Sequence, residues 1–370
     1  MRNCAAVGLI FANMHDEAVR ECTAVRSMGS LPFGGRYRLI DFVLSNMVNA
    51  GITKVGVITK TNNQSLMDHL GSGKAWDLSR KNAGLYFLPS YNSDDALYQG
   101  RLSSLAEVIP FLRRSKEDYV ILSDCHMVSS IDYAPMLQAH IENEADVTVA
   151  CCRGAVPHLT DIPVMQLNEE GRVTDLLIGR LSDDEATYGV GIYIVRKDWL
   201  IRVASEAAAR NLQHFERDIL QKHLHEFYIQ GYVVPELMLP IYSLESYFRA
   251  NLSMLDGEVR QQLFPKSRPV YTKLRDCTSV RYGLHAHVTN SLVADGAKVD
   301  GTVKNCVLFR GVNVSRDAVL ENCVVMQDVT ITGQCALTNV VADKNAVFRE
   351  GCVLHGTDSY PVYIAKNAIV

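Results

Sequence analysis

The sequence predicts an α/β domain followed by a smaller parallel β-helix, and three observations carry this prediction. Short β-rich apolar runs alternate with helical patterns from residue 5 to about 240, as in a sheet covered by helices. Helical periodicity ends after Asp276, and a repeat of 17 residues takes its place. A chain of 370 residues also exceeds the usual size of a single core. We therefore expect domains at 1–256 and 276–370, with a connector at 257–275.

The elements of the first domain follow from its periodicity. The N-terminal apolar run to Phe11 is a buried strand, and the clearest later strands are 55–59, 119–123, 147–151 and 191–195. Helical spacing predicts helices at 62–70, 102–113, 133–144, 217–226 and 244–255. Strands and helices in alternation indicate a parallel sheet, so a ligand site is expected where strands end, after Phe11, Thr59, Leu122 and Val195.

The stretch 33–52 begins with a glycine turn, Gly34-Gly35, where backbone can approach a ligand closely. Apolar residues then follow at helical spacing, while Arg36, Arg38 and Asp41 fall mainly off the apolar face. Taken alone, the pattern is typical of an amphipathic surface helix with solvated charges.

The second domain is predicted from an asparagine repeat. Asn305, Asn322 and Asn339 lie 17 residues apart, and Asn290 lies 15 residues before the first of them. Three short strands in each 17 or 18 residues are typical of a hexapeptide-repeat β-helix, in which about four stacked coils enclose the core. The last coil has an unpaired strand edge and apolar residues such as Ile369. An edge of this kind invites pairing with another chain, so we expect self-association.

Composition excludes several classes of protein. The net charge is −4, and the 37 basic residues form no block or stripe, so we expect no nucleic-acid partner. The N-terminal apolar run is too short to cross a bilayer, and we expect no membrane partner. The ten cysteines contain no Cys-x-x-Cys pair and several lie in apolar runs, which indicates reduced thiols and a cytoplasmic location.

Several runs carry a resemblance to a known family. They are Phe33 to Phe42 (FGGRYRLIDF), 55–59, 215–220, 246–252 and 290–296. With the order of the two domains, they resemble ADP-glucose pyrophosphorylase, or glucose-1-phosphate adenylyltransferase, of bacterial glycogen synthesis. The resemblance implies a Rossmann-like, GT-A-like nucleotidyltransferase domain and a left-handed β-helix. It also implies formation of ADP-glucose from ATP and glucose 1-phosphate, with Mg²⁺ at the phosphates.

The residues that the family uses for chemistry are replaced in this sequence. Its glycine-rich phosphate loop falls on 11–19, where glycine is absent and Asp16 and Glu17 bring negative charge. Its phosphate-binding lysine falls on Met28.

The metal and sugar-phosphate positions are changed too. The metal-binding aspartate falls on His126, two residues after Asp124, and imidazole is a poor ligand for Mg²⁺. The lysine for glucose 1-phosphate falls on Gly179, next to Arg180. We therefore interpret Met28, Asp124, His126 and Gly179 as a degenerate site and assign no catalytic residue or metal ligand.

This pattern resembles the regulatory D-type subunit of the family. The resemblance implies allosteric activation of a catalytic partner chain in a heterotetramer, with Mg²⁺ in that partner and no cofactor assigned here. Remnants of a substrate or effector pocket would be Gly34, Gly35, Arg36, Arg38, Arg180 and Asp218. A phosphorylated sugar effector could bind the basic connector residues Lys266, Arg268, Lys273 and Arg275, although a solvated linker explains them as well.

Two other functions remain open on the sequence. One is an active adenylyltransferase that uses Asp124 for metal and Arg36, Arg38 and Arg180 for phosphates. The other is a hexapeptide acyltransferase that acts through His285, His287 or His355.

Overall fold

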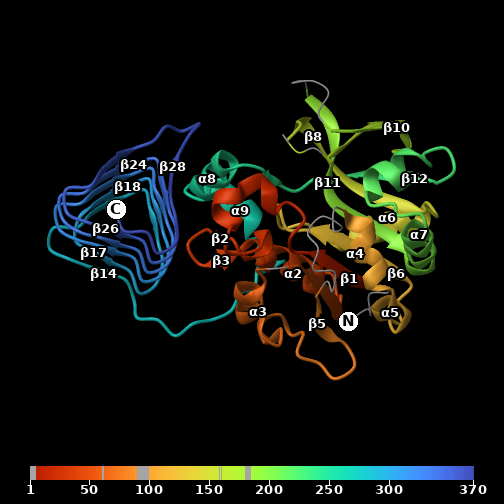
Figure 1. Ribbon diagram of the computed structural model, residues 1–370, viewed down its shortest axis with the longest axis horizontal. Coiled ribbons are helices and arrows are strands. Elements are labelled where there is room, and N and C mark those ends of the chain that lie inside the picture. The colour runs from red at the N-terminus through yellow and green to blue at the C-terminus, as the bar shows by residue number, and fades with distance from the viewer. Residues whose placement is uncertain (1–5, 61, 90–99, 158, 160, 180–184) are drawn as a thin grey trace.

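The structure, a computed structural model, has two domains that lie side by side (Figure 1). An α/β domain comes first, and a left-handed parallel β-helix follows it, so the predicted fold class is confirmed. The described residues are 6–60, 62–89, 100–157, 159, 161–179 and 185–370.

Nine strands form the central sheet of the first domain. They are β1 (Ala6–Phe11), β4 (Lys54–Thr59), β5 (Gly84–Pro89), β6 (Tyr119–Asp124), β8 (Val147–Ala155), β9 (Pro163–Leu167), β10 (Val173–Ile178), β11 (Glu185–Arg196) and β12 (Ile229–Val233). The main path runs β10-β9-β11-β6-β1-β4-β5, and β8 pairs with β11 and β12. All six residues of β1 are buried, as expected for a strand with neighbours on both sides.

The sheet is mixed, which corrects the expectation of a parallel one. β6, β1, β4 and β5 run parallel, whereas β11 runs antiparallel to both β6 and β8. The antiparallel hairpin of β9 and β10 lies between β8 and β11 along the chain, and β11 then runs opposite to β8. The carboxyl ends of β1, β4 and β6 still meet at one edge, where a ligand site is expected.

Helices cover both faces of this sheet. One face carries α2 (Leu39–Asn49), α3 (Gln64–Leu70) and α6 (Tyr133–Glu142), and the other carries α4 (Arg101–Glu107), α5 (Ile109–Arg113) and α7 (Lys197–Ala209). The helix predicted at 102–113 divides at Val108, because Pro110 has no amide hydrogen to continue the bonding pattern. The helix predicted at 217–226 is the π-helix η4 (Phe215–Gln221).

Short elements complete the first domain. They are η1 (Asp16–Val19), α1 (Arg20–Thr23), η2 (Met28–Ser30), β2 (Pro32–Phe33), β3 (Tyr37–Arg38), η3 (Lys74–Trp76), β7 (Met127–Val128), β13 (Leu239–Pro240), α8 (Leu244–Ser253) and α9 (Gly257–Leu263). Helix α9 occupies the start of the predicted connector 257–275.

The β-helix contains three parallel sheets of five strands each, one more coil than expected. The first sheet is β14 (Arg281–Tyr282), β17 (Lys298–Val299), β20 (Asn313–Val314), β23 (Thr330–Ile331) and β26 (Val347–Phe348). The second is β15 (His287–Thr289), β18 (Thr302–Lys304), β21 (Val319–Glu321), β24 (Ala336–Thr338) and β27 (Val353–His355). The third is β16 (Leu292–Val293), β19 (Val307–Leu308), β22 (Val324–Val325), β25 (Val340–Ala342) and β28 (Val362–Ile364).

The asparagine repeat marks one corner of four successive coils. Asn305, Asn322 and Asn339 each have φ of +52°, a left-handed conformation that asparagine tolerates better than most residues. Their side chains also bond from coil to coil, since Asn290 donates to Asn305 at 2.8 Å and Asn305 donates to Asn322 at 3.2 Å. The repeat therefore sets both the turn and the stacking register.

The two domains share a continuous core. Phe309 and Met326 of the β-helix belong to the same buried cluster as Phe33 and Met254 of the first domain. Helix α8 lies between the domains and contacts β22. The core of the β-helix therefore continues into the first domain through apolar contacts.

Helix α2 is buried, which corrects the interpretation of 33–52 as a surface helix. Every residue from Leu39 to Met47 is buried, including the polar ones. Asp41 accepts a bond from the Arg38 amide at 3.0 Å, and the Asn46 side chain donates to the Ser129 carbonyl at 2.9 Å. The polar residues off the apolar face therefore bond inside the domain.

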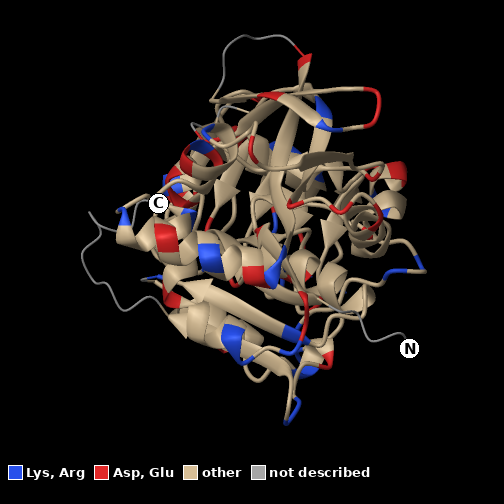
Figure 2. Cartoon of the chain, turned by 90° about the vertical axis from the view of Figure 1, so that its right-hand side faces the viewer, with Lys and Arg blue, Asp and Glu red and all other residues tan. Residues whose placement is uncertain are grey.

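Charge is spread evenly over the visible face of the first domain. In Figure 2, acidic and basic residues alternate over the described residues without a continuous basic stripe. None of the helices in the described ranges has the length and apolar character that crossing a bilayer requires.

Candidate functional site

A buried ion pair occupies the carboxyl edge of the sheet. Asp124 ends β6, and Arg101 begins α4 on the covering layer. The two terminal nitrogens of Arg101 donate to the two carboxylate oxygens of Asp124 at 2.7 and 2.8 Å. Both residues are at most 3% exposed. Such a bidentate pair is the strongest form of this contact, and it uses both oxygens of Asp124.

Glu216 and Tyr193 complete the surroundings of Arg101. The Arg101 Nε donates to Glu216 at 3.0 Å, and the Tyr193 hydroxyl donates to the same oxygen at 3.0 Å. The guanidinium also lies 4.6 Å from the centre of the Phe11 ring. Burial alone would raise the pKa of Asp124, but the Arg101 charge holds that pKa far below its usual range.

Two histidines approach Asp124 from the other side. His15 Nε2 lies 3.1 Å from Asp124 Oδ2, and the His15 and His126 ring centres are 4.1 Å apart. His126 is 1% exposed, and neither of its ring nitrogens has a hydrogen-bond partner in the described part of the chain. Burial, followed by the charge of His15, lowers the pKa of His126. One ligand atom from each of His15, Asp124 and His126 lies within 4.8 Å of the others.

Gly191 makes room for this cluster. Its φ is +73°, and a Cβ there would lie 2.5 Å from Asp124 Oδ2 and 2.9 Å from His126 Cε1. The register of β11 against β8 shifts between Gly189 and Tyr193, so the strand bulges at this point. Both conformation and space therefore require glycine.

The donor set does not fit the Mg²⁺ that the family implies. Mg²⁺ takes near-octahedral oxygen ligands and usually keeps several waters. Here Asp124 supplies the only carboxylate of the cluster, a guanidinium bonds to both of its oxygens, and His126 stands where the resemblance places the metal-binding aspartate.

The loop after β1 is closed by its own hydrogen bonds. Asp16 accepts the Met28 amide at 2.7 Å and the Asn13 side chain at 2.7 Å, and the Gly29 amide donates to the Ala12 carbonyl at 3.0 Å. Burial raises the pKa of Asp16 to about 6. Met28 itself is 1% exposed in the core. Asp16 therefore ties the loop to Met28 and brings a carboxylate into the segment where the resemblance places phosphate binding.

The Gly34-Gly35 turn faces the β-helix. Both residues have positive φ, +57° and +85°. A Cβ on Gly35 would lie 3.7 Å from the Leu308 carbonyl oxygen and 3.8 Å from Ala294. The predicted pocket remnant is thus a contact between the domains.

Arg36 and Arg38 contact residues other than Asp124. Arg36 is exposed, with its guanidinium 6.0 Å from the Tyr37 ring. Arg38 is buried and donates to the Ser65 carbonyl at 2.6 Å and hydroxyl at 3.0 Å.

The remaining predicted site residues have structural contacts. The Gly179 amide donates to the Ile162 carbonyl at 3.0 Å after β10, and Arg180 lies outside the described residues. Asp218 accepts the His214 amide at 3.1 Å and the Lys222 ammonium at 2.8 Å, so it stabilises the start of η4.

The basic connector is partly tied to the first domain. Arg268 donates to the Ser130 carbonyl at 3.0 Å, and Lys273 donates to the Asp68 carbonyl at 2.5 Å. Lys266 and Arg275 are exposed.

A second cluster of cations lies where the domains meet. Arg26 is 2% exposed and pairs with Asp343 of the β-helix at 2.8 Å. Lys344 follows Asp343, and burial together with the charges of Arg38 and Arg26 lowers its pKa to about 7. Arg275 also acts on the pKa values of Arg38 and Lys344. We refer to Arg26, Arg38, Arg275 and Lys344 as the junction cations.

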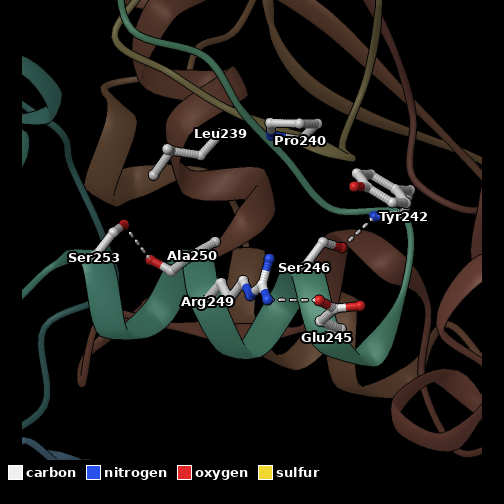
Figure 3. A pocket seen from close by; sticks show the side chains of 8 residues that line it. All are labelled: Leu239, Pro240, Tyr242, Glu245, Ser246, Arg249, Ala250 and Ser253. Carbon is white, nitrogen blue, oxygen red and sulfur yellow. Dashed lines mark hydrogen bonds and ion pairs between the residues drawn. The ribbon is translucent and has the colours of Figure 1, made fainter. Parts of the chain in front are cut away.

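A pocket of about 230 Å³ lies along α8 (Figure 3). Its charged lining residues, Glu245 and Arg249, pair with each other at 2.9 Å, and Tyr242 bonds to Ser246. Neither the Asp124 cluster nor the junction cations contribute to its lining.

Sequence reasoning missed several residues of these clusters. Arg101 and His15 contact Asp124 from two separate elements, and Glu216 contacts Arg101 from η4. The charge of Arg38 acts on Lys344 of the β-helix. One feature of the sequence could have indicated the cluster: His15 is a histidine in the loop where the resemblance places phosphate binding.

Comparison with known proteins agrees with this architecture. The model of the nucleotidyl transferase family matches residues 19–257, and the GlmU-like C-terminal hexapeptide model matches residues 278–360. The glycogen biosynthesis protein GlgD of Bacillus subtilis (strain 168) is 34% identical over 370 residues, covering 100% of this chain and 98% of the relative. GlgD of Geobacillus stearothermophilus is 37% identical over 322 residues, covering 86% and 83%.

Glucose-1-phosphate adenylyltransferases are also similar. That of Clostridium botulinum (strain Alaska E43 / Type E3) is 31% identical over 379 residues, covering 100% of this chain and 97% of the relative. The chain therefore belongs to the nucleotidyltransferase family of the ADP-glucose pyrophosphorylase type, with GlgD proteins among its similar relatives.

Proposed function

We propose that this chain is a catalytically degenerate regulatory subunit in glycogen biosynthesis, which assembles with a catalytic ADP-glucose pyrophosphorylase chain and raises its activity. The observation that carries the proposal is the bidentate contact of Arg101 with Asp124, which gives both oxygens of the one carboxylate in this cluster to a guanidinium. Asp16 and the buried Met28 support it further, because they put a carboxylate and a thioether where the resemblance places a glycine-rich loop and a lysine.

The alternative of an active enzyme with relocated groups is less well supported. Asp124 is bonded to Arg101, and Arg38 is bonded to Ser65. Arg38 would have to break a buried contact to bind phosphate, and the Arg101-bonded Asp124 does not supply the oxygen-rich ligand set that Mg²⁺ requires.

The test compares turnover of this chain alone with turnover of mixtures. Pyrophosphate release is followed with ATP, glucose 1-phosphate and Mg²⁺, using this chain, a catalytic partner chain, and both together. We expect negligible turnover alone and faster turnover in the mixture. Mixing with a partner inactivated at its own metal-binding aspartate is the control, since this chain would supply no chemistry. Turnover by this chain alone at ordinary enzymatic rates, or no change on mixing, overturns the proposal.

We propose further that a phosphorylated sugar effector binds at the junction cations. Arg26 pairs there with Asp343, which also accepts the Tyr363 hydroxyl at 2.7 Å, and the charges of Arg26, Arg38 and Arg275 act on the neighbouring Lys344. An anion at this place would contact both domains and so favour one domain arrangement over another. Binding of a hexose phosphate is expected to weaken in Lys344→Met, and Lys298→Met, a change at an exposed lysine of β17, is the control.

We assign the chain to the cytoplasm. Every cysteine among the described residues is unpaired, which is usual in a reducing compartment. The catalytic partner, which would hold Mg²⁺, acts there on ATP and glucose 1-phosphate.

A further inference from the structure

We propose that His15, Asp124 and His126 form a buried site for one divalent transition metal ion of the Zn²⁺ class. The site lies in the degenerate active centre, but it uses a different set of donors from the oxygen ligands of Mg²⁺. Two imidazoles and one carboxylate are a donor set that suits Zn²⁺, Co²⁺ or Fe²⁺. The proposal does not depend on whether the chain activates a partner.

His126 is a buried residue whose ring nitrogens need partners. Its ring is 1% exposed, and both ring nitrogens lack a partner within the described residues. A buried imidazole with two unbonded nitrogens is costly, and an ion or water is the usual explanation for such a group. Because the ring faces His15 and lies beside Asp124, the missing partner can be shared by all three side chains.

The distances between the three side chains suit one shared ion. His15 Nε2 and Asp124 Oδ2 are 3.1 Å apart, and His126 Nδ1 and the same oxygen are 4.0 Å apart. Ligand atoms about 2.0–2.2 Å from one ion lie roughly 3–3.5 Å from each other. His126 Nδ1 has to move closer to the oxygen when an ion binds. Arg101 takes one lone pair of Asp124 Oδ2, and the ion would take the other in place of the present contact with His15 Nε2.

Asp161 lies beside the other nitrogen of His15. The distance from His15 Nδ1 to Asp161 Oδ1 is 3.9 Å, which is an ion-pair distance and would have to shorten for a hydrogen bond, and the Asp161 side chain is 31% exposed. A carboxylate that receives the N–H of a metal-bound histidine is usual in zinc sites, where it fixes the ring and raises its basicity. Asp161 also marks the solvent side of the cluster, from which an ion would enter.

The charges agree with a divalent ion. Asp124, Glu216 and Asp161 carry three negative charges, and Arg101 carries one positive charge. A divalent cation on two neutral imidazoles balances the remaining two. The guanidinium therefore holds Asp124 in place, while the histidines distinguish this ion from Mg²⁺.

The experiment uses the full chain without a histidine tag. After incubation with Zn²⁺ and gel filtration, elemental analysis is expected to find one equivalent bound, and excess Mg²⁺ should not displace it. Co²⁺ is expected to give visible d–d absorption bands. His15→Ala and His126→Ala should each abolish both signals, and Asp161→Asn should weaken binding about 10- to 100-fold.

The matched control is His140→Ala, at a buried histidine whose Nδ1 bonds to Thr148 at 2.8 Å. It should bind metal as the unchanged chain does. Less than a tenth of an equivalent of Zn²⁺ on the unchanged chain overturns the proposal, as does binding by the His15→Ala and His126→Ala variants that equals binding by the unchanged chain. If a ligand variant does not fold, imidazole NMR of the unchanged chain decides: Zn²⁺ must shift the resonances of His15 and His126, and shifts confined to other histidines overturn the site.

Discussion

Arg26 and Asp343 lie 317 residues apart in the sequence and form an ion pair of 2.8 Å between the two domains. Both side chains are almost completely buried, and the Tyr363 hydroxyl donates to the other oxygen of Asp343 at 2.7 Å. The contact therefore fixes one orientation of the β-helix against the first domain, beside the apolar core that the domains share.

Asp343→Ala is expected to lower the free energy of unfolding by about 3–5 kcal/mol, because it leaves the buried Arg26 without its partner. Urea denaturation measures the change. Glu321→Ala is the control, since Glu321 pairs with Lys304 at 2.7 Å on the exposed face and should cost at most about 1 kcal/mol. Equal losses in the two variants would contradict the structural role of Asp343.

Arg101→Leu should also destabilise the chain by about 3–5 kcal/mol, because Asp124 and Glu216 would be left buried without a cation. The readout is again urea denaturation. The control is Arg20→Ala, at an exposed pair with Glu17, where the change should stay within about 1 kcal/mol. A loss no larger than the control would mean that water or another cation replaces the guanidinium.

Restoring two family residues is not expected to restore turnover. In the double variant Met28→Lys with His126→Asp, Arg101 still bonds to both oxygens of Asp124, and Asp16 still accepts the backbone amide of residue 28. Pyrophosphate release should stay at the level of the unchanged chain, with circular dichroism as the control for folding. Turnover that rises to ordinary enzymatic rates would show that the Arg101 contact opens readily.

Sulfate binding at the junction cations should weaken as the pH rises through 7. The pKa of Lys344 is lowered to about 7, so its ammonium is largely charged below that pH and largely neutral above it. Sulfate keeps its charge in this range, and Arg38, whose pKa is lowered to about 10, stays charged, so the pH dependence reports Lys344. Titration calorimetry at pH 6 and pH 8 measures the effect, and proton uptake should accompany binding at pH 8. Lys344→Met should bind weakly with the same affinity at both values; an unchanged pH dependence in that variant would contradict the assignment.

Asn322→Ala should cost about 1 kcal/mol more than Asn322→Gly. Both changes remove the bond that Asn305 donates, but only alanine is strained at φ of +52°. Thermal denaturation of the two variants gives the difference directly. Equal stabilities would mean that the coil corner relaxes to negative φ.

The sequence predicted the β-helix well because its coils are local. The spacing of Asn305, Asn322 and Asn339 places equivalent residues one coil apart, and the pairing of β18, β21 and β24 follows that spacing. Whether a residue of a coil faces the core or solvent was harder to predict. Val319 and Val353 are apolar residues two 17-residue repeats apart, yet they are 47% and 70% exposed.

The candidate site was predicted only in part. Asp124 and His126 follow from the position of β6, because a strand end locates the residues after it. Arg101 could not be placed, because its contact depends on how α4 packs on the sheet and not on any spacing to Asp124. The burial of Asp41 and Asn46 was missed for a similar reason: their partners come from α3 and from the segment after β7.

The glycine turn at Gly34 and Gly35 has a practical consequence for assigning activities to genomes. Both glycines have positive φ, and Gly35 lies against Leu308 and Ala294 of the β-helix. A chain can therefore use this turn for the contact between its domains whether or not it carries out nucleotide chemistry. Searches keyed to the turn alone identify the shared architecture, and the residues at positions 28 and 126 have to be read beside it before an activity is assigned.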